Sequence, residues 1–131
     1  MQAALRHRGP DGSGQYTGEG LGLVHNRLAI IDLQTGDQPI ISPDGIALIA
    51  NAEIYNYLEL RQNMPEIQWQ TFSDCEPALH LYRRDGIDFA DQLRGMYAIA
   101  IYDPGEGQLL LARDPFGIKP IYYVEGEFGF A

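Results

Sequence analysis

The chain has 131 residues, of which 45% are apolar and 21% are charged, and its 18 acidic and 9 basic side chains give a formal charge of -9. This length and composition predict one folded domain with a single core and exclude a disordered or collagen-like protein. The negative charge argues against nucleic acid and anionic membranes as partners.

Short apolar runs between glycine and proline residues predict strands. In chain order, these are residues 21–25 with a continuation over 28–33, then residues 46–50, 95–103 and 109–112. The last two runs are apolar on both alternating faces and are joined by the turn-forming residues 104–107. We therefore expect a hairpin in a sheet that is packed between other layers.

Two helices are predicted, over residues 54–64 and 73–84. The second begins with the sequence SDCE, the form of a capping box, in which the Ser73 hydroxyl and the Glu76 carboxylate satisfy backbone donors. Gly86 follows as the predicted end of this helix. No apolar run approaches the roughly 20 residues that a membrane helix needs, and residues 1–9 contain no hydrophobic signal segment. We expect a cytoplasmic protein.

Cys75 is the single cysteine, so neither an internal disulfide nor a structural zinc site with a second thiol is expected. It falls in the first turn of the second predicted helix, where the helix dipole favours a thiolate. A nucleophilic thiol also needs a base, but His80 is roughly 140 degrees away around the helix. We interpret Cys75 as a small buried side chain.

Polar side chains interrupt the apolar pattern at strand ends and at a helix start, where sites are often built. Arg27 interrupts the first strand region, Asn51 and Glu53 close the strand over 46–50, and Asp74 occupies the first turn of a helix. An arginine fork fits a carboxylate, an aspartate can hold an ammonium group, and an asparagine amide can donate to an oxyanion. Together these residues predict a site for a free amino acid.

Each of these residues also has a purely structural interpretation, which the sequence leaves open. Arg27 could pair with Asp32, Asp74 could favour the helix dipole, and Asn51 could form a turn. No single residue decides between the two interpretations.

The sequence predicts no metal or nucleotide site. The histidines His7, His25 and His80 lack the spacing of metal ligands, and no glycine-rich loop of a phosphate-binding form occurs.

Seven segments appear in one order across nearly the whole chain. They are residues 6–11 (RHRGPD), 25–32 (HNRLAIID), 38–39 (QP), 51–56 (NAEIYN), 73–76 (SDCE), 95–98 (GMYA) and 112–120 (ARDPFGIKP). In these segments the chain resembles the class II glutamine amidotransferases, and among them most closely the amidotransferase domain of the asparagine synthetases. We expect residues 1–131 to be one such domain, truncated at both ends and without the synthetase domain.

The resemblance implies the fold of the N-terminal nucleophile hydrolases. This is an α+β fold, a four-layer αββα sandwich of two mainly antiparallel sheets between helical layers. The strands that are apolar on both faces agree with it. One sheet is expected to lack its first strand region.

The same resemblance implies roles for the polar residues. Arg27 would bind the glutamine carboxylate and Asp74 its ammonium group. Asn51 and the backbone N–H of Ala52 would form the oxyanion hole, and Glu53 would contact the substrate. One wall of the pocket would be lined by Arg27, Leu28, Ala29, Ile30 and Ile31.

The chain departs from the family pattern in two places. The family nucleophile is a cysteine at the start of the mature chain, whose own amine serves as the base. Here Met1 is followed by Gln2, so we expect the chain to be inactive alone. Ala52 stands where the family usually has glycine, and its methyl group could narrow the oxyanion hole or forbid a positive φ angle.

The resemblance implies that the parent enzyme hydrolyses glutamine to glutamate and ammonia through a thioester, and uses the ammonia for ATP-dependent amidation of aspartate. Expected partners are glutamine and the synthetase domain, with a homodimer left open. No cofactor is expected in this domain, because ATP and magnesium would bind in the synthetase domain. The alternatives are a non-catalytic glutamine-binding or assembly module of the same fold, and an amidotransferase with a different ammonia acceptor.

Overall fold

The computed structural model describes residues 2–127 and 129–131 and has the α+β class that the sequence predicts. In chain order the elements are α1 (Gln2–Leu5), β1 (Gly12–Gly18), β2 (Leu21–Arg27), β3 (Ile40–Ile41), β4 (Ala47–Ile54), α2 (Tyr57–Gln62), α3 (Glu76–Asp85), the 3-10 helix η1 (Gly86–Gln92), β5 (Gly95–Asp103), β6 (Gln108–Arg113), β7 (Glu125–Gly126) and β8 (Gly129–Phe130). None of the described helices is long and apolar enough to cross a membrane.

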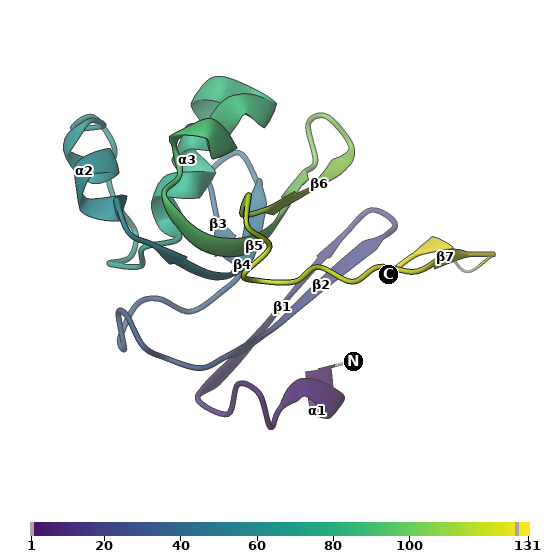
Figure 1. Cartoon of the computed structure of the whole chain (residues 1–131). Helices are drawn as coiled ribbons and strands as arrows, with labels where there is room; N and C mark the ends of the chain where they lie inside the picture. Colours follow the sequence, from purple (N-terminus) through teal and green to yellow (C-terminus); the bar gives the residue numbers. More distant parts are fainter. Residues whose placement is uncertain (1, 128) are drawn as a thin grey trace.

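The main sheet consists of four antiparallel strands in the order β3-β4-β5-β6, and α2, α3 and η1 lie together on one of its faces (Figure 1). The predicted hairpin is confirmed as β5 and β6, with Ile99 paired to Ala112 across it. Ile99 and Ile101 are fully buried, as are Leu79 of α3 and Phe89 of η1. The main core therefore lies between this sheet and the helices.

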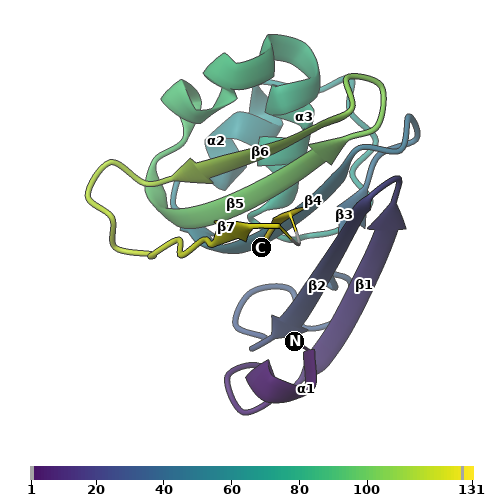
Figure 2. The same ribbon diagram turned by 90° about the vertical axis from the view of Figure 1, so that its right-hand side faces the viewer.

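The β1-β2 hairpin lies against the other face of the main sheet (Figure 2). Leu23 of β2 packs there with Ala47 and Tyr102. The short helix α1 contacts β2, where Asn26 Nδ2 donates to the carbonyl oxygen of Gln2 at 2.6 Å. The helices, the main sheet and the hairpin thus stack in that order, with the single turn α1 at the end of the hairpin, and these mainly antiparallel sheets under helices agree with the αββα sandwich that the resemblance implies.

Alternation along β4 divides its side chains between two cores, because successive residues of a strand point to opposite faces. Leu48, Ala50 and Ile54 pack on the helical side, whereas Ala47 and Ile49 pack on the hairpin side. β4 extends to Ile54, so the predicted strand over 46–50 is too short at its C-terminal end.

The predicted strand continuation over residues 28–33 is wrong. The main chain turns there, and Asp32 has a φ angle of 54°, in the left-handed region that a strand does not use. The Arg27 side chain bonds the carbonyl oxygens of Ile31 and Asp32, so these groups are not available to a neighbouring strand. Strand β1, whose residues include three glycines, was also not predicted.

The predicted capping box is also wrong, although its helix is confirmed as α3. Helix α3 begins at Glu76 and no side chain caps it. The hydroxyl of Ser73 accepts from the N–H of Cys75 at 3.2 Å. The Glu76 carboxylate accepts instead from the N–H groups of Gln70 and Thr71, at 2.7 and 2.8 Å. The carboxylate therefore holds the preceding loop rather than the helix start.

The other predicted helix is confirmed as α2, but it is shorter than the predicted range 54–64 at both ends, since Ile54 belongs to β4 and the helix covers Tyr57–Gln62. Gly86, with a φ angle of 62°, ends α3 as predicted. The 3-10 helix η1 follows directly and was not predicted.

Candidate functional site

The candidate site lies along the edge of β4 that continues beyond the short strand β3. The N–H of Ser42 donates to the carbonyl oxygen of Ile46, so the even-numbered residues of β4 direct their backbone groups to this edge. At Ala50 the N–H donates to Oε1 of Gln38 at 2.6 Å, and at Ile54 the N–H donates to Oδ2 of Asp74 at 2.8 Å. Side chains thus satisfy the edge on both sides of residue 52.

Ala52 lies midway between these two capped positions, so its N–H is directed to the same edge. Among the described residues, no side chain accepts a hydrogen bond from that N–H. The methyl group of Ala52 packs against the core on the helical side. Asp32 is the one non-glycine residue with a positive φ angle among the described residues, so Ala52 keeps an ordinary strand conformation. Its methyl group therefore points away from the edge.

Arg27 ends β2 and is almost fully buried. Its Nη2 donates to the carbonyl oxygens of Ile31, at 2.9 Å, and of Asp32. Its Nη1 forms an ion pair with Oδ1 of Asp37 at 3.2 Å. The guanidinium thus contacts the main chain of Asp32 rather than its carboxylate, and its charged partner is Asp37.

The Asp32 carboxylate links the turn around Arg27 to the segment before Asp74. It accepts from the N–H of Thr35 and from the N–H of Phe72, each at 2.8 Å. Although desolvation acts to raise the pKa of Asp32, the hydrogen bonds from Thr35 and Phe72 lower it. The turn is therefore held to the same part of the molecule as Asp74.

Asp74 is 5% exposed and has no ion-pair partner within the part of the chain that the structure describes. Besides the N–H of Ile54, the Cys75 thiol donates to its carboxylate at 3.7 Å. Burial raises the pKa of Asp74, and the nearby charge of Glu53 raises it further, whereas the bond from Ile54 lowers it. A buried carboxylate in this state is complementary to a cation.

The charges of Asp74 and Arg27 act in opposite directions on the pKa of the Cys75 thiol. Burial raises the pKa of Cys75, the charge of Asp74 raises it further, and the charge of Arg27 lowers it. The thiol is buried and its pKa lies well above the ordinary range, so Cys75 is not a thiolate. The interpretation of Cys75 as a small buried side chain agrees with these observations.

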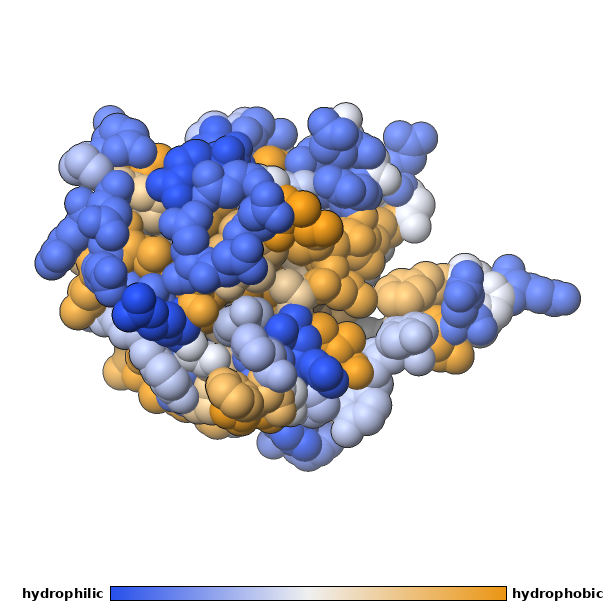
Figure 3. Space-filling view, turned by 45° about the horizontal axis from the view of Figure 1, so that its top comes forward, coloured by the Kyte–Doolittle hydropathy of each residue, from blue (hydrophilic) through white to orange (hydrophobic). Residues whose placement is uncertain are grey.

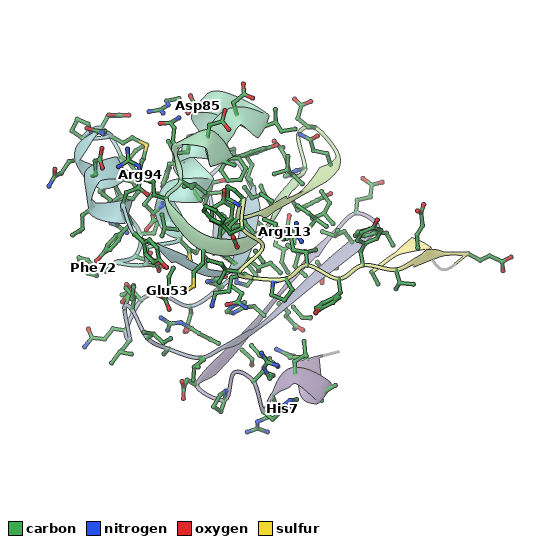
Figure 4. The ribbon with its side chains drawn as sticks, viewed as in Figure 1. His7, Glu53, Phe72, Asp85, Arg94 and Arg113 are labelled. Carbon is green, nitrogen blue, oxygen red and sulfur yellow. The ribbon has the colours of Figure 1, made fainter. Side chains whose placement is uncertain are left out.

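The remaining predicted site residues surround this region. The loop after β2 exposes Leu28 and Ile30, and the N–H of Ala29 donates to Asp11 at 2.9 Å. Asn51 is exposed on β4, and Glu53 is half-buried. Figure 4 shows Glu53 and Phe72 on the same side of the molecule. On the face shown in Figure 3, patches of hydrophobic residues are exposed to solvent among the hydrophilic ones.

A cavity of about 560 Å³ lies beside this region, at the base of the β1-β2 hairpin. It is lined by Gln2, Ala3, Arg6, Gly9, Pro10, Gly12, Ser13 and Asn26. Its lining includes the neighbour of Arg27 in β2 but neither Arg27 nor Asp74. The binding roles of those two residues stay predictions.

Three further residues shape the site and were not predicted, namely Gln38, Asp37 and His25. Gln38 caps the N–H of Ala50, and His25 Nε2 donates to the carbonyl oxygen of Ala50 at 3.3 Å. Burial lowers the pKa of His25, which favours the neutral ring. Gln38 and His25 belong to segments that carry the family resemblance, but nothing in the sequence pointed to Asp37. The described residues contain no group of three or more potential metal ligands.

A family model described as a glutamine amidotransferase domain matches residues 1–131. The chain is 43% identical over 126 residues to an asparagine synthetase [glutamine-hydrolyzing] of Bacillus subtilis (strain 168), an alignment that covers 95% of the chain and 17% of that protein. It is 45% identical over 135 residues to one from Arabidopsis thaliana, covering 100% and 23%, and 45% over 124 residues to a probable one from Schizosaccharomyces pombe, covering 93% and 22%. The chain thus spans about a fifth of the length of these relatives.

Proposed function

Because the chain belongs to the glutamine amidotransferase family, we propose that it binds L-glutamine as part of an enzyme that hydrolyses glutamine to glutamate and ammonia. The relatives are named glutamine-hydrolysing asparagine synthetases. We therefore propose that the whole protein uses the ammonia to amidate aspartate in a second, ATP- and magnesium-dependent domain, in the cytoplasm.

The proposal rests on the burial of the Asp74 carboxylate without a cation beside it. Its carboxylate is buried, accepts one backbone hydrogen bond from Ile54, and has no cation against it among the described residues. Burying a carboxylate without a cation is costly, and the α-ammonium group of an amino acid would neutralise it. Asp74 therefore supports recognition of the ammonium end.

Arg27 supports recognition of the carboxylate end. Two backbone carbonyl groups fix one side of its guanidinium, so the group is oriented before a ligand arrives. An oriented guanidinium loses little further freedom when it binds a carboxylate. Arg27 and Asp74 would then hold the two charged ends, and the side-chain amide of glutamine would lie toward the edge of β4.

The edge of β4 supplies donors for the reaction. When a thiolate adds to the amide carbon of glutamine, the carbonyl oxygen becomes an oxyanion. The N–H of Ala52 and the amide group of Asn51 would donate to that oxyanion. The C–N bond then breaks as its nitrogen takes up a proton and leaves as ammonia, and water hydrolyses the resulting thioester to glutamate and the free thiol.

The nucleophilic thiol of this reaction is not Cys75. Its side chain is buried, burial raises its pKa, and its hydrogen bond is to a carboxylate rather than a base. We propose that residues 1–131 bind and orient glutamine and stabilise the oxyanion, while the attacking thiol belongs to another part of the whole protein.

The binding claim is tested by steady-state kinetics of glutamate formation in the full-length protein. Arg27→Ala and Asp74→Ala should each weaken glutamine binding by about 2 kcal/mol or more, which raises KM roughly 30-fold. Arg83→Ala, which removes an exposed ion pair with Asp44 at 2.9 Å, is the matched control and should leave KM unchanged. An unchanged KM in both site variants would show that the pocket lies elsewhere.

A further inference from the structure

The contacts of the Arg27 guanidinium fall into two kinds. Nη2 donates to the backbone carbonyl oxygens of Ile31 and Asp32, which engages both of its hydrogens. Nη1 donates to Oδ1 of Asp37 at 3.2 Å. A carboxylate ligand that approaches the terminal nitrogens of Arg27 therefore meets Nη1, where the Asp37 carboxylate already lies.

The two carbonyl contacts are fixed by the fold. The turn that supplies them is held by the bonds of the Asp32 carboxylate to Thr35 and Phe72. Gly36 packs so closely on the guanidinium that a Cβ atom there would clash with Nη2 of Arg27. Both carbonyl groups are thus held in place by main-chain and side-chain contacts of the turn itself.

The contact of Arg27 with Asp37, in contrast, is made by a side chain that is free to move into solvent. The side chain of Arg27 is 10% exposed, whereas that of Asp37 is 80% exposed. Among the described residues, Asp37 has no side-chain hydrogen-bond partner besides Arg27. An exposed carboxylate can return to water at little cost, so this half of the ion pair can separate.

We propose that Asp37 is an exchangeable counter-ion, which occupies Nη1 of Arg27 in the free protein and gives way to the α-carboxylate of glutamine. This inference rests on the proposed function, in which Arg27 binds that carboxylate. Asp37 takes one hydrogen of Nη1, and a second carboxylate on the same nitrogen would be repelled by it, so the ligand binds best when Asp37 has left. Asp37 therefore weakens the binding of ligands that carry an α-carboxylate and leaves the binding of others unchanged.

The test removes the charge of Asp37 with a substitution that keeps the shape of the side chain. In the full-length protein, Asp37→Asn should lower KM for L-glutamine about two- to fivefold with kcat unchanged, because the ligand no longer displaces an ion pair. Asp37→Ser should act in the same direction, and Asp37→Glu, which keeps the charge, should stay near the parent value. The side chain is exposed, so these variants should fold.

A ligand comparison separates this effect from a general change in the site. The glutamine analogue 4-aminobutanamide lacks the α-carboxylate, so its inhibition constant should be the same in the parent and in Asp37→Asn. Asp44→Asn, which removes the carboxylate of another exposed ion pair, is the control and should leave KM unchanged.

The possible results separate the exchange of Asp37 from the proposed glutamine binding on which it rests. If Arg27→Ala raises KM but Asp37→Asn leaves KM unchanged or raises it, the exchange is overturned and the proposed function stands. If both ligands bind more tightly to Asp37→Asn, the exchange at Arg27 is also overturned. If Arg27→Ala leaves KM unchanged, the proposed role of Arg27 fails and the exchange fails with it.

Discussion

The carboxylate of Asp74 accepts a hydrogen bond from the backbone N–H of Ile54 at 2.8 Å, which ties the segment before α3 to the end of β4. This bond satisfies one carboxylate oxygen but does not neutralise the charge. Burial therefore still raises the pKa of Asp74 above its ordinary value of 3.8. The folded protein holds a carboxylate that takes up a proton more readily than the unfolded chain does.

The raised pKa of Asp74 predicts how glutamine binding depends on pH. A bound ammonium group favours the ionised carboxylate, so affinity should fall as the pH drops through the raised pKa of the free protein. The fall should begin at a higher pH than an ordinary aspartate would give. The measurement is kcat/KM for glutamine in the full-length protein across mildly acidic pH.

Asp74→Asn is the control for this pH dependence, because its Oδ1 can still accept from Ile54 while the charge is gone. It should bind glutamine weakly and lose the acidic limb of the profile. A raised folded pKa also means that the ionised form costs stability, so at neutral pH this variant should unfold at the same temperature or a higher one. An identical acidic limb in Asp74→Asn and the parent would rule out Asp74 as its source.

The strands could be predicted where the apolar pattern alone decides the structure. Residues 95–103 are apolar on both faces, and they form β5 with the predicted bounds. The prediction failed over residues 28–33, where the Arg27 side chain binds main-chain carbonyl groups. No periodicity reports a contact of this kind, because it depends on where a side chain from the preceding strand points.

Contacts between residues far apart in the sequence also limited the prediction of the site. Asp74 was predicted as a site residue from its chemistry and from an expected place in the first turn of a helix, but it precedes α3, and its partner, the N–H of Ile54, is a backbone group 20 residues away. Glu76 was assigned to a capping box from its spacing to Ser73, yet its carboxylate turns back to Gln70 and Thr71. Local spacing cannot distinguish these two uses of one carboxylate.

The second prediction concerns Glu76, which is 0% exposed. Its carboxylate accepts from the N–H groups of Gln70 and Thr71, and it lies 3.6 Å from Nη2 of Arg61 and 3.5 Å from Nε2 of His80. Glu76→Ala leaves these partly buried donors and the buried His80 without their acceptor and should lower the free energy of unfolding by about 3 kcal/mol, measured by urea denaturation.

Asp85→Ala is the control for Glu76→Ala. Asp85 also bonds side chains near α3, but its partner Arg84 is exposed, so this change should cost less than about 1 kcal/mol. Although burial acts to raise the pKa of Glu76, its hydrogen bonds from His80, Gln70 and Thr71 lower it. The stability it contributes is present above the unfolded pKa and lost as the pH falls through the lowered folded pKa. Equal losses in both variants would contradict this account.

The third prediction concerns the amide of Asn51, which is exposed on β4 next to Ala52. Removing one oxyanion donor typically lowers turnover about 100- to 1000-fold. Asn51→Ala in the full-length protein should therefore lower kcat for glutamate formation by about that factor while KM for glutamine changes little. Asn56→Ala is the control, because its amide bonds the backbone of Gln92 and Arg94 and should affect stability rather than kcat. A large rise in KM for Asn51→Ala with kcat retained would assign it to ground-state binding.

The last prediction concerns Cys75, whose position at a helix start suggests a reactive thiol. The structure gives it the opposite environment, because burial and the charge of Asp74 both raise its pKa. Cys75→Ala should keep the parent kcat and KM for glutamine and should cost roughly 1 kcal/mol of stability, the value of a small buried contact. In the native protein, iodoacetamide should leave the peptide that contains Cys75 unmodified, as mass spectrometry would show, and denaturation should expose it to alkylation. If glutamate formation disappears in Cys75→Ala while the variant remains folded, this thiol is the nucleophile and the oxyanion hole must be sought beside α3 rather than at the edge of β4.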